Sequence, residues 1–336
     1  MLFGALQEDP ITSGIGQRPA AGKEAVRLAV TLGDVRGVGP ELASAAAEAL
    51  KTEADRPQLV FVGPSGTVAD LGADEFIPVG EWRGGGDLEA GRFAGLAISK
   101  AIQIIQAGEA DALVTTPIDK SALNAAGFHY PGHTEYLADL CKAKQSCMLM
   151  AAEQTPLGGP LRIALATTHI PLKNVPAALT IRCVVDRTVM VAAGLRHGWG
   201  LSNPRIGLCA LNPHASDGGL FGNEEAEILA PALEELQDQG IDVKGPIPAD
   251  TIFLRALAGE FDAVLVPYHD VGMATFKTVA FGRGVNVTLG LPFPRTSPDH
   301  GTAMDIAGKG QVRTDSMMEA VRLATKLSWR WTRLPW

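Results

Sequence analysis

The sequence predicts an α/β protein with a largely parallel sheet, and three observations support that fold class. Short apolar runs alternate along the 336-residue chain with longer segments of helical periodicity. Polar or glycine-rich turns follow several of these runs, where α/β proteins hold ligands. The composition, 46% hydrophobic and 20% charged, is that of a globular protein. The length allows one large α/β domain or two smaller ones.

The first apolar run, 25–32, predicts a strand, and Pro40 predicts the start of a helix that runs to about Lys51, because proline is well tolerated in a first helical turn. Between them lies a glycine-rich turn, 33–41. It matches neither the dinucleotide fingerprint nor the phosphate loop, so a tight turn and a ligand loop are equally compatible with it.

The same patterns predict the remaining elements in order. Strands are expected at 58–62, 112–115, 161–167, 206–211, 242–245 and 264–267. Helices are expected at 89–107, 120–126, 135–142, 179–197, 224–239, 250–257 and 315–331. Residues 1–22 lack the features of a signal peptide and are expected to form a loose extension.

Charge and hydropathy argue against two classes of partner. A formal net charge of −8 argues against general nucleic-acid binding, which needs a basic surface. No run of about 18 apolar residues is present, so no membrane-spanning helix is expected. The four cysteines lack CxxC spacing and are typical of reduced core residues in a cytoplasmic protein. They are Cys141, Cys147, Cys183 and Cys209.

Three histidines, His169, His214 and His269, each follow a predicted strand. Because the carboxyl ends of parallel strands meet at one edge of a sheet, the three imidazoles are placed to converge. Three neutral histidines suit zinc, cobalt or a similar divalent ion and leave room for a substrate. Chance placement is the alternative, since the chain has seven histidines.

The stretch 262–310 is dense in polar groups among glycines and prolines, which is typical of a site. These groups are Tyr268, His269, Asp270, Lys277, Arg283, Asn286, Arg295, Asp299 and His300. Lysine and arginine side chains suit a carboxylate or phosphate ligand. His133 and Thr134, at a predicted helix start, are also placed to contact an anion, although Thr134 also suits a simple N-cap.

Seven segments resemble, in order, the motifs of the 4-hydroxythreonine-4-phosphate dehydrogenase family of pyridoxal phosphate biosynthesis, over roughly Leu28 to Gly310. They are GDVRGVGPE, TTPIDKSALNAAGFHYPGHTEYLA, THIPLKNVPAALT, LNPHASDGGLFGNEE, PADTIF, YHDVG and FGRGVNVTLGLPFPRTSPDHGTAMDIAGKG. The resemblance implies the fold of the isocitrate and isopropylmalate dehydrogenases, with two α/β domains and an inter-domain cleft. The expected division is 23–143 plus 285–336, and 144–284.

Carried over by position, the resemblance assigns the site residues. The implied metal ligands are His169, His214 and His269, and the implied substrate contacts are His133, Thr134, Lys277, Asn286 and Arg295. The candidate general bases are Asp250 and Asp270, which are expected to lie close to the metal histidines. The histidines not expected to bind the metal are His129, His197 and His300.

The implied reaction is a metal-dependent oxidation of 4-phosphooxy-threonine by NAD or NADP. Its 3-keto acid product would lose carbon dioxide to give 3-amino-2-oxopropyl phosphate. The ion would be zinc, magnesium or cobalt, and the protein a cytoplasmic homodimer with its site at the subunit interface.

Departures from the motifs, at Val35, Arg36, Val271, Pro294 and Pro298, leave the substrate open. Alternatives are a 4-phospho-erythronate or threonate, a dihydrodiol dicarboxylate, or a non-catalytic role in binding a metal or ligand.

Overall fold

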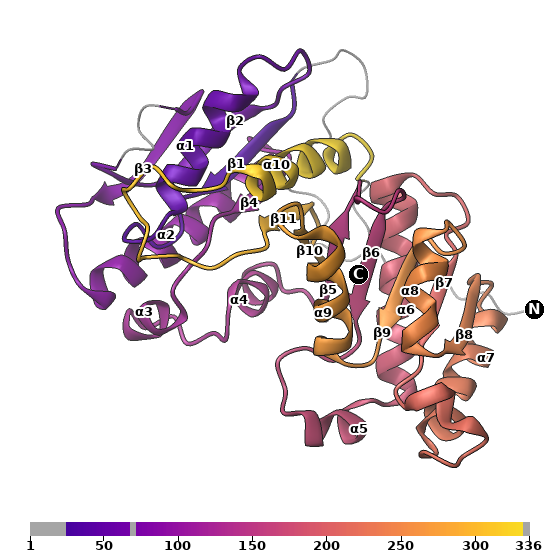
Figure 1. The fold of residues 1–336 in the computed structure, drawn as a ribbon. Helices are drawn as coiled ribbons and strands as arrows, with labels where there is room; N and C mark the ends of the chain where they lie inside the picture. The colour runs from indigo at the N-terminus through magenta and orange to yellow at the C-terminus, as the bar shows by residue number, and fades with distance from the viewer. Residues whose placement is uncertain (1–24, 68–71, 332–336) are drawn as a thin grey trace, which may run out of the picture.

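The computed structural model describes residues 25–67 and 72–331, and within them eleven strands form one sheet. The strand order is β3-β2-β1-β4-β11-β10-β5-β6-β9-β7-β8. Figure 1 shows two lobes that meet at β5, β10 and β11, with helices on both faces of the sheet. The predicted α/β class is therefore confirmed. The predicted loose extension, 1–22, lies outside the described residues.

The first lobe contains parallel strands from both ends of the chain. They are β1 (Arg27–Thr31), β2 (Gln58–Ser65), β3 (Glu75–Glu81), β4 (Ala112–Thr115) and β11 (Arg295–Pro298). Its helices are α1 (Gly39–Leu50), α2 (Asp87–Gln106), α3 (Lys120–Ala125), α4 (His133–Leu140) and α10 (Asp315–Ser328). Because β11 pairs with β4, the C-terminal part of the chain completes a lobe that the N-terminal part begins.

The second lobe also contains parallel strands. They are β6 (Leu161–Leu165), β7 (Ile206–Cys209), β8 (Val243–Ile247) and β9 (Ala263–Val266). Its α-helices are α5 (Val175–Ala178), α6 (Ile181–Gly194), α7 (Ala230–Asp238), α8 (Ala249–Leu257) and α9 (His269–Ala280). Shorter 3₁₀ or π turns are η2 (Leu172–Asn174), η3 (Leu195–Trp199), η4 (Pro213–Asp217) and η5 (Glu225–Leu229).

Antiparallel pairing joins the two lobes. Strand β10 (Val285–Leu289) runs antiparallel to both β11 and β5 (Cys147–Ala152), and β5 runs antiparallel to β6. The sheet is thus largely parallel, as predicted, but changes strand direction at its centre. The domain boundaries proposed from the sequence stay a prediction.

The apolar core is continuous on one face of the sheet and divided on the other. On the first face, α1, α6, α7 and α10 cover one cluster of buried residues that spans both lobes. On the second face, α2 packs on the first lobe and α8 and α9 pack on the second, in two separate clusters. The two clusters leave the central strands free to present polar side chains between them.

The glycine-rich turn 33–41 is a tight packing turn. Gly33 has φ +65°, and a Cβ there would lie 2.1 Å from the carbonyl oxygen of Pro117. The amide of Val38 donates to the carbonyl of Thr302, which ties the turn to the chain after β11. Pro40 lies in the first turn of α1, as predicted.

The remaining predictions about composition concern the cysteines and membrane spans. All four cysteines are free, and burial raises the pKa of the Cys147 thiol to about 11 and that of Cys209 to about 12. In the part of the chain that the structure describes, no helix combines the length and the apolar character needed to cross a membrane.

Candidate functional site

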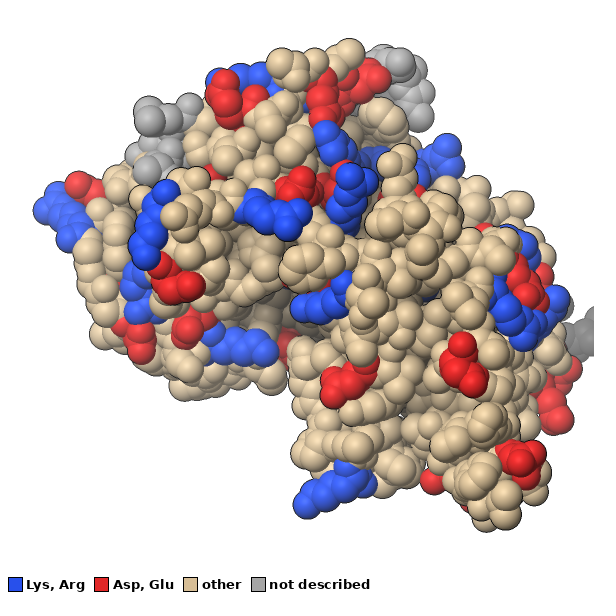
Figure 2. Space-filling model, viewed as in Figure 1, with Lys and Arg blue, Asp and Glu red and all other residues tan. Residues whose placement is uncertain are grey.

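A cavity of about 340 Å³ lies over the central strands, where the core of the second face is divided. Thr115, Arg295 and Asn286 line it from β4, β11 and β10, while His169 and Lys277 line it from the second lobe. We call it the central cavity. Figure 2 shows basic side chains along the junction of the two lobes, on a molecule whose net charge is −8.

Arg295 is the most deeply buried charged group of the central cavity, with 2% of its surface exposed. Its Nη1 and Nη2 donate to the hydroxyls of Thr288 and Thr115, at 3.0 and 2.6 Å. Its Nε has no hydrogen-bond partner among the described residues. Burial lowers the pKa of Arg295 to about 10, so the guanidinium remains charged at neutral pH. A buried cation of this kind is suited to an anionic ligand.

His133 is the first residue of α4, and its buried Nε2 has no partner in the described part of the chain. Burial, followed by the charges of Arg295 and Lys120, holds the pKa of His133 well below its usual value, so its imidazole is neutral at pH 7. Gly132 is the N-cap of α4 and no side-chain capping bond forms there, which excludes the simple N-cap interpretation of Thr134. Both His133 and Thr134 line the central cavity, as expected of substrate contacts.

Lys277 and Asn286 are the other two expected substrate contacts in the cavity. The Lys277 ammonium lies 3.3 Å from a carboxylate oxygen of Asp299, so its charge is already paired. Burial raises the pKa of Asp299, although Lys277 opposes the shift. The Oδ1 atom of Asn286 is buried without a partner among the described residues. All five predicted contacts therefore line the central cavity. Their roles in substrate binding stay a prediction.

His169 and His269 lie side by side, with ring centroids 5.3 Å apart. The Nδ1 of His269 is 2.7 Å from Asp270 Oδ1, and the Tyr268 hydroxyl donates to Asp270 Oδ2 at 3.0 Å. This carboxylate contact orients the ring and leaves Nε2 of His269 available as a ligand. Burial lowers the pKa of His169, with further contributions from Lys120 and His269, and so favours the neutral imidazole that metals bind. The pair fits a divalent metal ion.

His214 does not complete this pair within one chain. It lies in η4, where residues 214–217 all have positive φ, and its ring centroid is 6.5 Å from that of Phe221. Across residues 25–67 and 72–331, no three His, Cys, Asp or Glu side chains converge closely enough to hold a metal ion. The three-histidine site therefore stays a prediction, with two of its members adjacent.

The two candidate bases differ in their surroundings. Both are exposed: Asp250 lies in the first turn of α8, whereas Asp270 is held by hydrogen bonds to His269 and Tyr268. Both side chains lie outside the lining of the central cavity. The structure favours Asp270 as a partner of His269 and leaves the identity of the base open to experiment.

The sequence analysis assigned no role to two charged residues of the cavity, Lys120 and Glu135. Both lie within the segment TTPIDKSALNAAGFHYPGHTEYLA, in which a predicted strand leads into polar residues. That pattern signals a site, but the sequence does not show which side chains turn inward.

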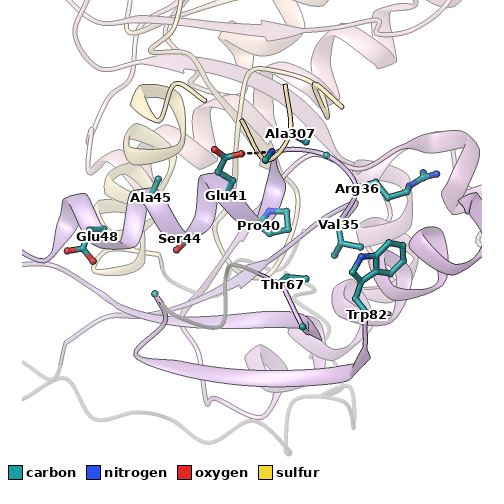
Figure 3. Close-up of a pocket in the computed structure, with 14 residues that line it drawn as sticks. Val35, Arg36, Pro40, Glu41, Ser44, Ala45, Glu48, Thr67, Trp82 and Ala307 are labelled. Atoms are coloured by element: carbon teal, nitrogen blue, oxygen red, sulfur yellow. Dashed lines mark hydrogen bonds between the residues drawn. The ribbon is translucent and has the colours of Figure 1, made fainter. Parts of the chain in front are cut away.

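Two further cavities border the loop that follows β11. One, of about 300 Å³, shares Lys277, Asp299 and His300 with the central cavity. The other, of about 710 Å³, lies against α1 and shares no lining residue with the central cavity (Figure 3). There Glu41 accepts a hydrogen bond from the Gly308 amide, and Arg36 is paired with Asp34 and Asp87. Although it is larger, this cavity has no unpaired cation among its described lining residues.

Comparison with known proteins agrees with the fold and with the family that the sequence motifs indicate. A model of the family described as pyridoxal phosphate biosynthetic protein PdxA matches residues 37–324. A 4-hydroxythreonine-4-phosphate dehydrogenase from Burkholderia vietnamiensis is 41% identical over 322 residues, covering 90% of this chain and 97% of that protein. A relative from Bradyrhizobium diazoefficiens, whose name proposes D-threonate 4-phosphate as its substrate, is 40% identical over 342 residues, covering 90% and 96%.

Solved structures show the same relationship. The 4-hydroxythreonine-4-phosphate dehydrogenase of Klebsiella pneumoniae matches with a TM-score of 0.80 at 33% identity, covering 90% of this chain and 99% of that one. A terephthalate 1,2-cis-dihydrodiol dehydrogenase from Burkholderia xenovorans matches with a TM-score of 0.65 at 27% identity, covering 90% and 98%. The chain belongs to the family of the pyridoxal phosphate biosynthetic protein PdxA, whose members are oxidoreductases.

Proposed function

We propose that this protein oxidises 4-phosphooxy-threonine with NAD or NADP, in a metal-dependent reaction, as a 4-hydroxythreonine-4-phosphate dehydrogenase. The 3-keto acid product then loses carbon dioxide to give 3-amino-2-oxopropyl phosphate. The observation that carries the proposal is Arg295, a buried cation whose hydrogen-bond partners are only hydroxyls among the described residues, in the same cavity as His169. Such a cavity combines an anion site with a metal site.

The anionic groups of the substrate are assigned to the first-lobe side of the cavity. Arg295 supplies charge, and His133, Thr134 and Asn286 supply polar groups around it. Lys277 approaches from α9 in the second lobe. A substrate held from both lobes has its reacting carbons fixed, which lowers the entropic part of the barrier.

The reacting alcohol is assigned to the side of His169 and His269. These two residues would hold the divalent ion, zinc, magnesium or cobalt, which supplies Lewis acidity that lowers the pKa of the substrate hydroxyl. Asp270 holds the ring of His269 in place, and Asp250 or Asp270 accepts the hydroxyl proton. A bound NAD or NADP would supply the hydride acceptor for the substrate carbon.

The cofactor is assigned to the cavity of about 300 Å³ that shares Lys277, Asp299 and His300 with the central cavity. A ligand in that cavity borders the substrate directly, which hydride transfer requires. The choice between NAD and NADP is left to experiment.

A second copy of the chain is proposed to supply His214. This histidine is exposed, and the same loop carries Leu220 and Phe221, which are 72% and 46% exposed. His214 lies apart from His169 and His269 of its own chain, and exposed apolar residues lie beside it. This arrangement suits a two-fold dimer interface, in which the His214 of each copy completes the metal site of the other. Cytoplasmic location accords with this role and with the four free cysteines.

Mixing two inactive variants tests this arrangement. His214→Ala and His269→Ala should each abolish turnover and remain folded. After subunit exchange, the site that combines the intact His269 of one copy with the intact His214 of the other regains activity. Random mixing should restore about a quarter of wild-type activity, because half of the dimers are mixed and each has one complete site. Full activity in a monomer would exclude the shared site.

Two other substrates are compatible with the family. One relative is named for D-threonate 4-phosphate, and this similarity supports a phosphorylated acid without the amine as an alternative substrate. The same anion site would accept such a substrate. The terephthalate dihydrodiol dehydrogenase shares the fold, but its dicarboxylate class of substrate has no phosphate. A purely binding role is the remaining alternative.

A substrate panel with cofactor reduction read at 340 nm distinguishes these functions. We expect the highest kcat/KM with 4-phosphooxy-threonine in the presence of one of the three metals, and a lower value with 4-phospho-threonate or 4-phospho-erythronate. A preference for the dihydrodiol dicarboxylate would contradict the proposal. Failure to reduce either cofactor with any of these substrates and metals would favour the binding role.

A further inference from the structure

Lys120 is a charged residue of the central cavity to which neither the family motifs nor the proposed function gives a role. It is the first residue of α3, whose N-cap Asp119 accepts a hydrogen bond from the Ala122 amide at 2.7 Å. A cation at a helix N-terminus is unfavourable, because it opposes the positive end of the helix dipole. The helix therefore gives no reason for a lysine at this position.

The Lys120 side chain extends toward the turn that carries His133. A Cβ placed on Gly132 would lie 3.7 Å from Lys120 Cε, which brings the side chain against the residue that caps α4. Lys120 also lines the same cavity as Arg295 on the anion side and His169 on the histidine side.

In the part of the chain that the structure describes, no carboxylate lies within ion-pair distance of the Lys120 ammonium. This distinguishes it from Lys277, which Asp299 engages at 3.3 Å. Arg295 and Lys120 are therefore the two unpaired cations among the described lining residues of the cavity.

The charge of the cavity depends on Lys120. Its lining contains three cations and two carboxylates: Lys120, Lys277 and Arg295 against Glu135 and Asp299. Without Lys120 the two signs balance, and a phosphate monoester, with a charge of about −1.5 to −2 at pH 7, would enter a neutral cavity. Lysine suits this position because its ammonium is a mobile point charge, whereas Arg295 is fixed by two threonine hydroxyls.

We infer that Lys120 is a substrate-binding residue that contacts the phosphate group together with Arg295, and that it makes the enzyme select phosphorylated over unphosphorylated substrates. The inference rests on the proposed function for the identity of the substrate, and on the cavity alone for the binding of a phosphate group.

The test compares Lys120→Met and Lys120→Arg with Lys144→Met, which removes an exposed lysine outside the cavity. The KM for 4-phosphooxy-threonine should rise about 10-fold or more in Lys120→Met, the size expected for one charge-assisted hydrogen bond. The kcat/KM for unphosphorylated 4-hydroxythreonine should stay unchanged, Lys120→Arg should recover part of the loss, and Lys144→Met should match the wild type. An equal loss for both substrates in Lys120→Met would overturn the inference.

A second measurement is independent of turnover. Inorganic phosphate binding to the purified protein is measured by calorimetry, together with the melting temperature of each variant. Lys120→Met should weaken phosphate binding without lowering the melting temperature. Unchanged phosphate affinity, or no phosphate binding by the wild type, would refute the role of Lys120. If phosphate binding depends on Lys120 but no cofactor is reduced, the proposed function fails and the anion contact stands.

Discussion

Two buried arginines, one in each lobe, differ in whether a carboxylate pairs with them. Arg162, on β6, donates from Nε and Nη2 to the same oxygen of Glu153, at 3.0 and 2.8 Å, and its guanidinium carbon lies 5.3 Å from the centre of the Trp199 ring. Arg295, on β11, has two threonine hydroxyls as partners and an Nε without one among the described residues. Both side chains are at least nine-tenths buried, at 8% and 2% exposure.

Under the proposed function, pairing and not burial separates the structural charge of Arg162 from the substrate-binding charge of Arg295. Glu153 is itself held by Trp199 Nε1 at 2.8 Å and Lys326 Nζ at 2.6 Å, so the cluster around Arg162 is complete within the protein. Under the proposed function, an anionic ligand completes the cluster around Arg295. A ligand can supply the charged partner that the protein does not provide. An unpaired buried charge of this kind gives affinity for a substrate but lowers the stability of the free protein.

The largest expected effect is the destabilisation of Arg162→Met. It leaves the half-buried Glu153 carboxylate with fewer partners, and breaking such a pair from one side costs about 3 kcal/mol of unfolding free energy. Urea unfolding measures the loss, with the exposed Arg83→Met as a control that changes stability by less than about 0.5 kcal/mol. Turnover of the folded fraction should match the wild type. A stable but inactive Arg162→Met protein would show that Arg162 acts in turnover and not in stability.

Arg295→Met should show the opposite pattern. We expect kcat/KM for the phosphorylated substrate to fall about 30-fold or more, equivalent to about 2 kcal/mol of lost charge-assisted binding. The unfolding free energy without ligand should not decrease, because an unpaired buried cation has been removed. Steady-state kinetics and urea unfolding of one preparation give both values. A destabilised Arg295→Met protein with normal kinetics would reverse the comparison.

Phosphate should stabilise the protein only through the region around Arg295. At ten times its dissociation constant, phosphate adds about 1.4 kcal/mol to the unfolding free energy, which corresponds to a rise of about 2 °C in Tm. Thermal melts should show this rise in the wild type and in Arg162→Met, and none in Arg295→Met. Equal shifts in all three proteins would mean that phosphate binds at another place.

The smallest effect concerns acid pH. Burial alone would raise the pKa of Glu153, but Arg162, Lys326 and Trp199 outweigh it and leave the folded pKa below the ordinary value of 4.5. The stabilisation from Glu153 is therefore complete above pH 4.5 and is lost as the pH falls through the folded pKa. Urea unfolding at pH 6 and pH 3.5 should show that Glu153→Gln lowers stability more at the higher pH. Arg295 stays charged over this range and adds no such dependence.

Local elements were predictable because their signals lie within short windows. Buried parallel strands such as β4 and β9 are continuous apolar runs, and Pro40 marks the start of α1. The sequence analysis placed no strand at β3, β5, β10 or β11 and no helix at α9. Strand β11, with the sequence RTSP, has no apolar pattern, because its buried side chains are polar and face the site or α10.

The membership of the site was more predictable than its electrostatics. The family resemblance, carried over by position, named five expected substrate contacts, and all five line one cavity. Their pairing depends on contacts between distant segments, so the sequence did not show that Asp299 engages Lys277 or that Arg295 lacks a carboxylate. For the same reason it did not show that His214 lies apart from His169 and His269 in one chain.

The first lobe contains strands from both ends of the chain, so the two lobes can be completed only in a fixed order during synthesis. Strands β6 to β9 come from one continuous segment, so the second lobe can form its parallel ladders before the ribosome reaches β10. The first lobe must wait for β11, since Arg295 meets Thr115 across 180 residues of sequence. The lining of the central cavity is therefore among the last features that a growing chain can assemble, and a nascent chain that stops before β11 lacks both Arg295 and its bond to Thr115.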